Sequence, residues 1–180
     1  MLSPAAINRS LRRFRRNQRG SAAVEFAFIA PMFFALIFAI IETSLVFFAG
    51  QVLETGTQDS ARLMYTHQAQ DSGMTQAQFK QDLCDRVAVL FTCAGITITQ
   101  KTYAPGVVIP AADLADPIAG GNFTGSASFQ SSSPGDTVVV RAFYQWPLFV
   151  TGLGYNIANL GSGSTSKRLL ASTAAFRVEP

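Results

Sequence analysis

The sequence predicts an α+β fold, in which a long N-terminal transmembrane helix extends into a domain of one further helix and a small antiparallel sheet. Three observations lead to this prediction. An arginine-rich start runs directly into a long apolar stretch, helical periodicity continues beyond that stretch, and the pattern changes to an alternation of period two after Gly95. We therefore expect a basic leader over residues 1–20, a transmembrane helix over 21–50 and an exported α+β domain over 51–180.

The positive charge of the chain is concentrated in the predicted leader. Residues 1–20 contain six arginines and no acid, which leaves eight basic and eleven acidic residues, a net charge of −3, for the rest of the chain. This distribution argues against a nucleic-acid-binding domain. Basic flanks stay in the cytoplasm, so we expect a cytoplasmic N-terminus and a periplasmic C-terminal domain. The leader arginines nearest the apolar stretch are Arg12, Arg13, Arg15, Arg16 and Arg19.

The apolar stretch is long enough to cross a bilayer. Residues 22–50 contain two charged side chains, Glu25 and Glu42. At about 1.5 Å per residue, residues 26–49 would extend for about 36 Å, more than the hydrocarbon thickness of about 30 Å. A signal peptide has a shorter apolar region that precedes its small-residue cleavage site, so we expect an anchor that is retained. Glu42 would lie either near the outer membrane interface or against partner helices.

The first helix is expected to continue to about Gln70 as an amphipathic helix. Its less polar residues fall on one stripe, which we expect to pack against the exported domain, with packing against neighbouring subunits as the alternative. This stripe comprises Val52, Leu53, Gly56, Ser60, Leu63 and Met64.

A second helix is predicted from Thr75 to Phe91. Thr75 is followed three residues later by Gln78, the spacing of a capping box. The spacing of four and three residues then places Phe79, Leu83, Val87 and Leu90 on one helical face.

The two cysteines, Cys84 and Cys93, have two interpretations. In an oxidising exterior they would form a disulfide, and the alternative is a pair of free, buried thiols. A metal site would need more ligands, and His67 is the one histidine of the chain, so we expect no metal and no cofactor.

Three strands are predicted after Gly95. Residues 96–103 alternate with period two, and residues 136–147 form the strongest strand, which Pro147 ends. Residues 166–178 would pair with that strand. Residues 104–135 are rich in Gly, Pro, Ser, Ala and Asp and predict a mostly irregular excursion with a short strand at 127–130, and 148–165 predict a loop. One face of the strongest strand would carry Val138, Val140, Ala142, Tyr144 and Trp146.

The sequence gives little support for an enzyme. His67 is the one candidate base for a nucleophile, and the pairs Asp82 with Asp85 and Asp113 with Asp116 have ordinary spacing. We expect no catalysis. The aromatic group of Phe143, Tyr144, Trp146 and Phe149 is interpreted as core, with a ligand platform as the alternative.

The window Gly20-Ser21-Ala22-Ala23-Val24-Glu25-Phe26 carries the most specific signal. It resembles the prepilins and pseudopilins that a membrane aspartyl peptidase cuts after glycine, with a glutamate at the fifth mature position. The resemblance implies cleavage between Gly20 and Ser21, with Glu25 and Phe26 as recognition residues.

Residues 19–62 resemble specifically the TadE family of tight-adherence (Flp) pilus proteins. The resemblance implies a pilin-like minor pilin or pseudopilin that resides in the bacterial inner membrane. The implied partners are the prepilin peptidase, other pilins, the Tad assembly platform and the lipid bilayer. Phe26 stands where the short major pilins typically have tyrosine, and Val178 stands where we expect asparagine. The rival interpretation is an uncut, single-span envelope protein with a periplasmic binding or scaffolding domain.

Glu25 has a physical explanation within this resemblance. A carboxylate in an apolar helix is costly in lipid unless the charge finds a partner. Cleavage after Gly20 would create an amine on Ser21, of the same chain or of a neighbour, which could pair with Glu25 and set the axial register between helices. The alternative is an acid at the headgroup level of a plain signal anchor.

Overall fold

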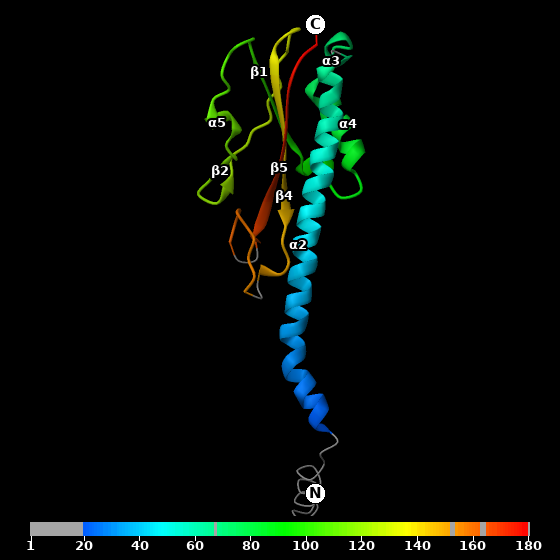
Figure 1. The fold of residues 1–180 in the computed structure, drawn as a ribbon, viewed down its shortest axis with the longest axis vertical. Helices are drawn as coiled ribbons and strands as arrows, with labels where there is room; N and C mark the ends of the chain where they lie inside the picture. Colours follow the sequence, from blue (N-terminus) through cyan, green and yellow to red (C-terminus); the bar gives the residue numbers. More distant parts are fainter. Residues whose placement is uncertain (1–19, 67, 152–153, 163–164, 180) are drawn as a thin grey trace, which may run out of the picture. The chain divides into compact units, whose positions relative to one another are not determined.

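The computed structural model describes residues 20–66, 68–151, 154–162 and 165–179. The chain divides into two compact units, Met1–Ile40 and Ile41–Pro180. Helix α2 (Ser21–Tyr65) begins in the first unit and ends in the second, and the second unit also contains every other helix and strand described (Figure 1). The predicted α+β class is confirmed. The second unit begins at Ile41, ten residues before the predicted domain boundary at residue 51.

From Ile41 onward, one face of α2 is buried. The buried positions recur every three or four residues, as one face of an α-helix requires, and the described positions before Ile41 have no fully buried side chain. The predicted stripe is therefore confirmed as core packing. The buried face starts earlier than predicted and consists of Glu42, Val46, Ala49, Leu53, Gly56, Thr57, Ser60, Ala61 and Met64.

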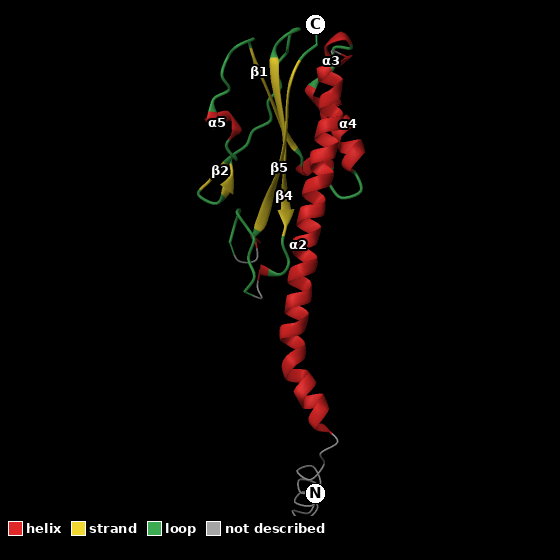
Figure 2. Cartoon of the chain, viewed as in Figure 1, coloured by secondary structure: helices red, strands yellow, loops and turns green. Residues whose placement is uncertain are grey.

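Two shorter helices follow α2, which ends at Tyr65 and not at the predicted Gln70. Helix α3 (Gln68–Asp71) is a single turn, and helix α4 (Gln76–Val87) packs beside the C-terminal half of α2 (Figure 2). The capping box is formed, because the Thr75 hydroxyl accepts from the Gln78 N–H and the Gln78 side chain accepts from the Thr75 N–H. The predicted helix end at Phe91 is four residues too late, and a short 3₁₀ turn, η2 (Cys93–Gly95), precedes the sheet.

The three predicted strands form one antiparallel sheet with the order β1-β4-β5. Its strands are β1 (Thr97–Tyr103), β4 (Thr137–Pro147) and β5 (Lys167–Arg177). Cα pairs such as Ile98 with Ala142 and Ala142 with Ser172 define the register. Even-numbered side chains of β4, such as Val140, pack with the helices, and odd-numbered ones, such as Phe143, face the opposite side.

The main core lies between the helices and the even-numbered face of β4. It joins Leu53 and Met64 of α2, Phe79 and Leu83 of α4, and Val140 of β4 in one cluster. Burial of each such side chain stabilises the fold by about 1.5–3 kcal/mol.

The excursion 104–135 covers the other face of the sheet. It contains α5 (Ala111–Leu114), β2 (Ile118–Ala119) and β3 (Asn122–Phe123), so it is more regular than predicted. Phe123 packs against Phe143 of β4 on this face. The strand predicted at 127–130 is wrong as a strand, because Ser128 forms only an isolated bridge with Thr99.

Close approach between α2 and α4 requires a glycine at position 56. A Cβ atom added at Gly56 would lie 2.6 Å from Cγ1 of the buried Val87, whereas one added at Gly50 would meet nothing within 4 Å. Alanine in a helix is favoured over glycine by about 1 kcal/mol, but overpacking costs about 1–3 kcal/mol. We therefore expect Gly56→Ala to lower the free energy of unfolding relative to Gly50→Ala by about 1–3 kcal/mol.

The comparison uses denaturant unfolding of the full chain in detergent micelles. Gly50→Ala is the matched control, since it gains the same helix propensity without the clash. Equal stabilisation by both substitutions would contradict the close packing of α2 on α4.

Candidate functional site

The segment around the predicted cleavage bond is exposed. Gly20 is the last residue before α2, and Ser21 is its first. Ala22 and Ala23 are exposed, as is Glu25, which occupies the fifth position of the helix. The leader arginines Arg12, Arg13, Arg15, Arg16 and Arg19 lie outside the described residues. The backbone thus offers a glycine followed by small residues, with little side-chain bulk beside the bond.

Phe26 begins a stretch in which the apolar side chains face outward. Phe28 is 77% and Met32 is 79% exposed, and none of the side chains from 22 to 41 is fully buried. Within the described part of the chain, α2 is the one helix long and apolar enough to cross a membrane. Residues 22–41 would extend for about 30 Å at 1.5 Å per residue, which matches one hydrocarbon thickness. This indicates a single-pass membrane protein.

Glu42 has a role that neither sequence interpretation anticipated. Its side chain is 5% exposed and lies against the loop after β4 of its own domain. The carboxylate accepts hydrogen bonds from the backbone N–H groups of Phe149 and Val150, the latter at 3.1 Å. The acid at the start of the buried face therefore ties the 148–150 loop to α2.

The two segments that form this contact also carry exposed aromatic side chains. Phe149 is 83% and Phe47 is 75% exposed, and Phe48 is also exposed. The hydroxyls of Thr43 and Tyr155 are hydrogen-bonded at 2.9 Å. Tyr155, whose ring has one polar end, is of the type enriched at membrane–water interfaces, and the three phenylalanines add exposed apolar surface.

The predicted aromatic core group is divided between three environments. Phe143 is buried on the excursion side, and Tyr144 and Trp146 are half-buried beside Phe91 on the helical side. The interpretation as core is wrong for Phe149, which lies beyond Pro147, where the strand and its alternation have ended.

The structure brings Cys84 and Cys93 together as a disulfide bond. The bond joins α4 to η2 and closes a loop of nine residues in sequence separation. The loop leads directly into β1, so the cross-link fixes where the sheet begins relative to the helical layer.

The four candidate carboxylates form hydrogen bonds or ion pairs with neighbouring side chains of the fold. Asp82 bonds Arg86 on the same helix at 2.9 Å, and Asp85 accepts from Gln81. The two acids of the excursion bond the sheet. Lys101 and Tyr103 of β1 donate to Asp113, and Arg141 of β4 donates to Asp116. His67 lies outside the described residues. In the described ranges, no group of three or more His, Cys, Asp or Glu gathers.

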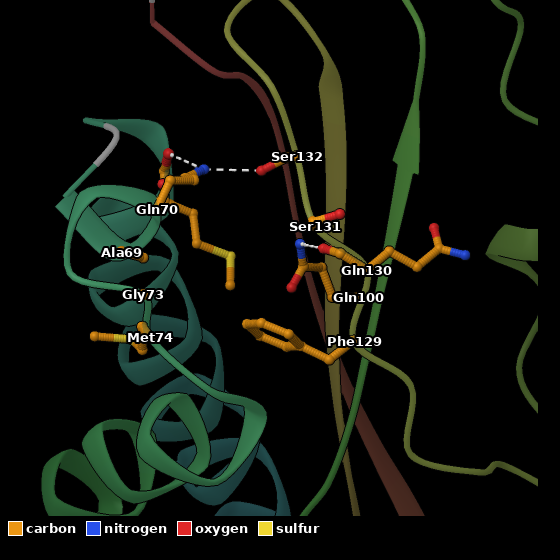
Figure 3. A pocket seen from close by; sticks show the side chains of 10 residues that line it. Ala69, Gln70, Gly73, Met74, Gln100, Phe129, Gln130, Ser131 and Ser132 are labelled. Atoms are coloured by element: carbon orange, nitrogen blue, oxygen red, sulfur yellow. Dashed lines mark hydrogen bonds between the residues drawn. The ribbon is translucent and has the colours of Figure 1, made fainter.

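An uncharged cavity of about 450 Å³ lies at the end of the core and is lined in part by Met64. Figure 3 shows Gln100 and Phe129 projecting toward the side formed by Gln70 and Ala69. The Gln70 amide donates to Ser132 Oγ at 2.8 Å, and the Gln100 amide donates to the Gln130 carbonyl at 2.6 Å. The residues that line this cavity come from several separate stretches of the sequence, so no local motif predicted the cavity.

The excursion contact generates a prediction on pH. The hydrogen bonds from Lys101 and then Tyr103 hold the pKa of Asp113 below its ordinary value of 3.8, and burial together with Asp113 raises the pKa of Tyr103 to about 12. The depressed pKa of Asp113 stabilises the fold above pH 3.8, and this contribution disappears as pH falls through the lower folded-state value. We expect Asp113→Asn to be less stable than the unchanged chain at neutral pH, with the difference shrinking below about pH 4.

The measurement is urea unfolding as a function of pH. Asp85→Asn is the matched control, because its partner Gln81 is neutral and lies on the same exposed helix surface. A stability difference for Asp113→Asn that stays constant down to pH 2 would refute the assigned ion pair.

The Glu42 contact generates a second prediction. Replacement by leucine leaves two backbone N–H groups of the loop without their acceptor, which costs about 1–3 kcal/mol, whereas glutamine keeps one acceptor oxygen. We expect faster amide hydrogen exchange at Phe149 and Val150 in Glu42→Leu, with a smaller increase in Glu42→Gln.

The control is Glu54→Gln, in which the exposed acceptor of Gln58 is neutralised on the same helix. It should leave the exchange of the 148–150 loop unchanged. Unaltered exchange in Glu42→Leu would show that the loop is held by other contacts.

The comparison with known families finds a match over part of the chain. The sequence model of the family described as TadE-like protein matches residues 20–62. This match confirms the predicted resemblance over the stretch that begins at Gly20 and ends near the C-terminus of α2. No curated protein and no solved structure matches the chain.

Proposed function

We propose that this chain is a minor pilin or pseudopilin of a tight-adherence (Flp) pilus. A prepilin peptidase cuts it after Gly20, α2 retains it in the bacterial inner membrane, and the mature subunit takes part in pilus assembly for surface attachment. The observation that carries the proposal is the coincidence of three positions. The TadE-like match begins at Gly20, Gly20 is exposed, and α2 begins at the next residue.

The charge distribution supports the proposed orientation. Six arginines precede α2, and basic flanks stay in the cytoplasm. The unit that contains the sheet would then lie in the periplasm, an oxidising compartment in which the Cys84–Cys93 disulfide persists. Glu42 is the first charged residue after the apolar stretch, and its carboxylate is bound by the exported domain.

The exposed apolar surface of α2 supports assembly through helix packing. Large side chains such as Phe28, Met32 and Leu36 are exposed and can contact lipid or neighbouring helices. Cleavage would remove all six leader arginines and leave an amine on Ser21, four residues before Glu25. Pairing of this amine with Glu25, on the same chain or a neighbour, would set the axial register. We propose no catalysis by the chain, whose role is that of a peptidase substrate and a structural subunit.

The test is the N-terminus of the protein in native membranes. We expect the mature chain to begin at Ser21, as measured by intact mass and N-terminal sequencing, and we expect the full leader to remain when the prepilin peptidase gene is deleted. In the same strains, Glu25→Ala should reduce incorporation into the pilus assembly.

Glu54→Ala is a matched control, because it removes a carboxylate from the same helix beyond the apolar stretch. An intact leader in membranes that contain the peptidase would favour the uncut, single-span envelope protein instead. Normal processing together with normal assembly of Glu25→Ala would eliminate the register role.

A further inference from the structure

The two edge strands of the main sheet differ in whether their outward backbone groups have hydrogen-bond partners. On β1, the residues whose backbone groups point away from β4 are those of even number. These groups already have partners. Ile98 accepts from Ser128, Gln100 donates to Ser128, and Thr102 donates to the side chain of Gln130. Residues 128–130 therefore close the β1 edge, as proteins commonly do to prevent strand addition.

On β5, the residues of odd number point away from β4. Val178 exchanges hydrogen bonds with Gly135 and Asp136 on the β4 side, which places every second residue before it on that side. At the other end, Lys167 bonds Leu160 and Leu169 donates to the Asn159 side chain, both on the outer side. The two ends of the strand agree, so the odd-numbered backbone groups face outward.

The outer edge of β5 is open only in its middle. Lys167 and Leu169 close the start, and the Glu179 N–H, bound to the Tyr65 carbonyl, closes the end. Between them, the outward backbone groups of Ala171, Thr173, Ala175 and Arg177 have no hydrogen-bond partner within the described chain. The first three of these residues are exposed and small, so their side chains do not block the edge.

A groove of about 490 Å³ follows this open edge. Its β5 side consists of residues 173–176, and its helical side includes Gln58, Ala61, Arg62 and Tyr65 of α2. The guanidinium of Arg62 is exposed on the groove, and in the part of the chain that the structure describes it forms no ion pair.

We propose that the β5 edge over residues 171–175 accepts an extended strand with an acidic side chain from a partner protein. The backbone of an added strand would satisfy the outward N–H and C=O groups of Ala171, Thr173 and Ala175. Its side chains on the α2 side would meet Ala61 and Phe176, which fits small or medium apolar groups. A carboxylate would complement Arg62.

The relative direction of α2 and β5 disfavours antiparallel pairing of the β5 edge with the β5 edge of a second copy. Thr57 contacts Ser172 and Tyr65 contacts Glu179, so α2 and β5 run in the same direction. Antiparallel pairing of two β5 edges would therefore orient the two α2 helices oppositely. Two copies anchored in one membrane have parallel helices, which excludes this antiparallel pairing between them, and the partner that we propose is a different extended segment. This argument rests on the proposed membrane anchoring.

The test uses the full chain in detergent micelles and a short peptide that alternates valine and threonine around one glutamate. Without peptide, the amides of Ala171, Thr173 and Ala175 should exchange faster than those of Ser172 and Ala174. The peptide should slow exchange at the three odd-numbered amides and shift their NMR signals in a saturable manner. Its N-methylated form, which cannot complete the ladder, should bind at least about tenfold more weakly.

Thr173→Pro removes one outward N–H and leaves the ladder to β4 intact, a placement that edge strands tolerate. We expect it to weaken peptide binding about tenfold, whereas Thr173→Val, which also loses the hydroxyl contact with Arg141, should bind normally. Arg62→Glu should reverse the charge preference and favour a peptide with lysine in place of glutamate.

Three results would overturn the proposal: slow exchange of the odd-numbered amides without peptide, equal binding of the N-methylated peptide, or chain dimers that form through β5 instead. The open edge is remote in sequence from Gly20, and peptide binding to the full chain in detergent micelles does not require cleavage after Gly20. Failure here therefore leaves the cleavage prediction intact, and an uncut leader leaves the strand-acceptor test intact.

Discussion

The packing of one face of α2 against the sheet, from Glu42 to Met64, is the interaction on which the rest of the domain depends. A three-stranded sheet has two faces to cover, and the excursion covers only one of them with few large side chains, Phe123 and Ile118 among them. The face that carries Val138, Val140 and Ala142 is buried because α2 and α4 lie on it. The helix that carries the apolar stretch therefore also forms one side of the hydrophobic core.

This double role explains the change of composition along α2. Before Ile41 none of the described side chains of the helix is fully buried in the chain alone, and lipid or other helices accept apolar residues on all sides. After Ile41, one side must fit a close-packed protein interior, which requires small or specific residues. Gly56 admits Val87, and Thr57 shares a hydrogen bond of 2.5 Å with Ser172.

Much of this architecture could be predicted from local patterns. Alternation of period two identified β1 and β4, and pairing with β4 was expected for β5; all three strands were predicted to within one residue at each end, and the Thr75–Gln78 spacing identified the start of α4. The resemblance at residues 20–62 could be recognised because a cleavage motif and an apolar helix are local signals. The role of Glu42 could not be predicted, since its partners lie more than one hundred residues away and are backbone groups. The open edge of β5 has the same limitation, because edge and centre strands share the same alternation.

The parallel course of α2 and β5 has a mechanical consequence. A load applied through Ile41 acts along the axis of α2, and hence along the length of its contact with β5. The contacts at Glu42, Thr57 and Tyr65 are distributed along that axis, so such a load shears them together and does not peel them apart one at a time. A domain attached in this geometry resists extraction from its own helix most strongly when the load is directed along α2.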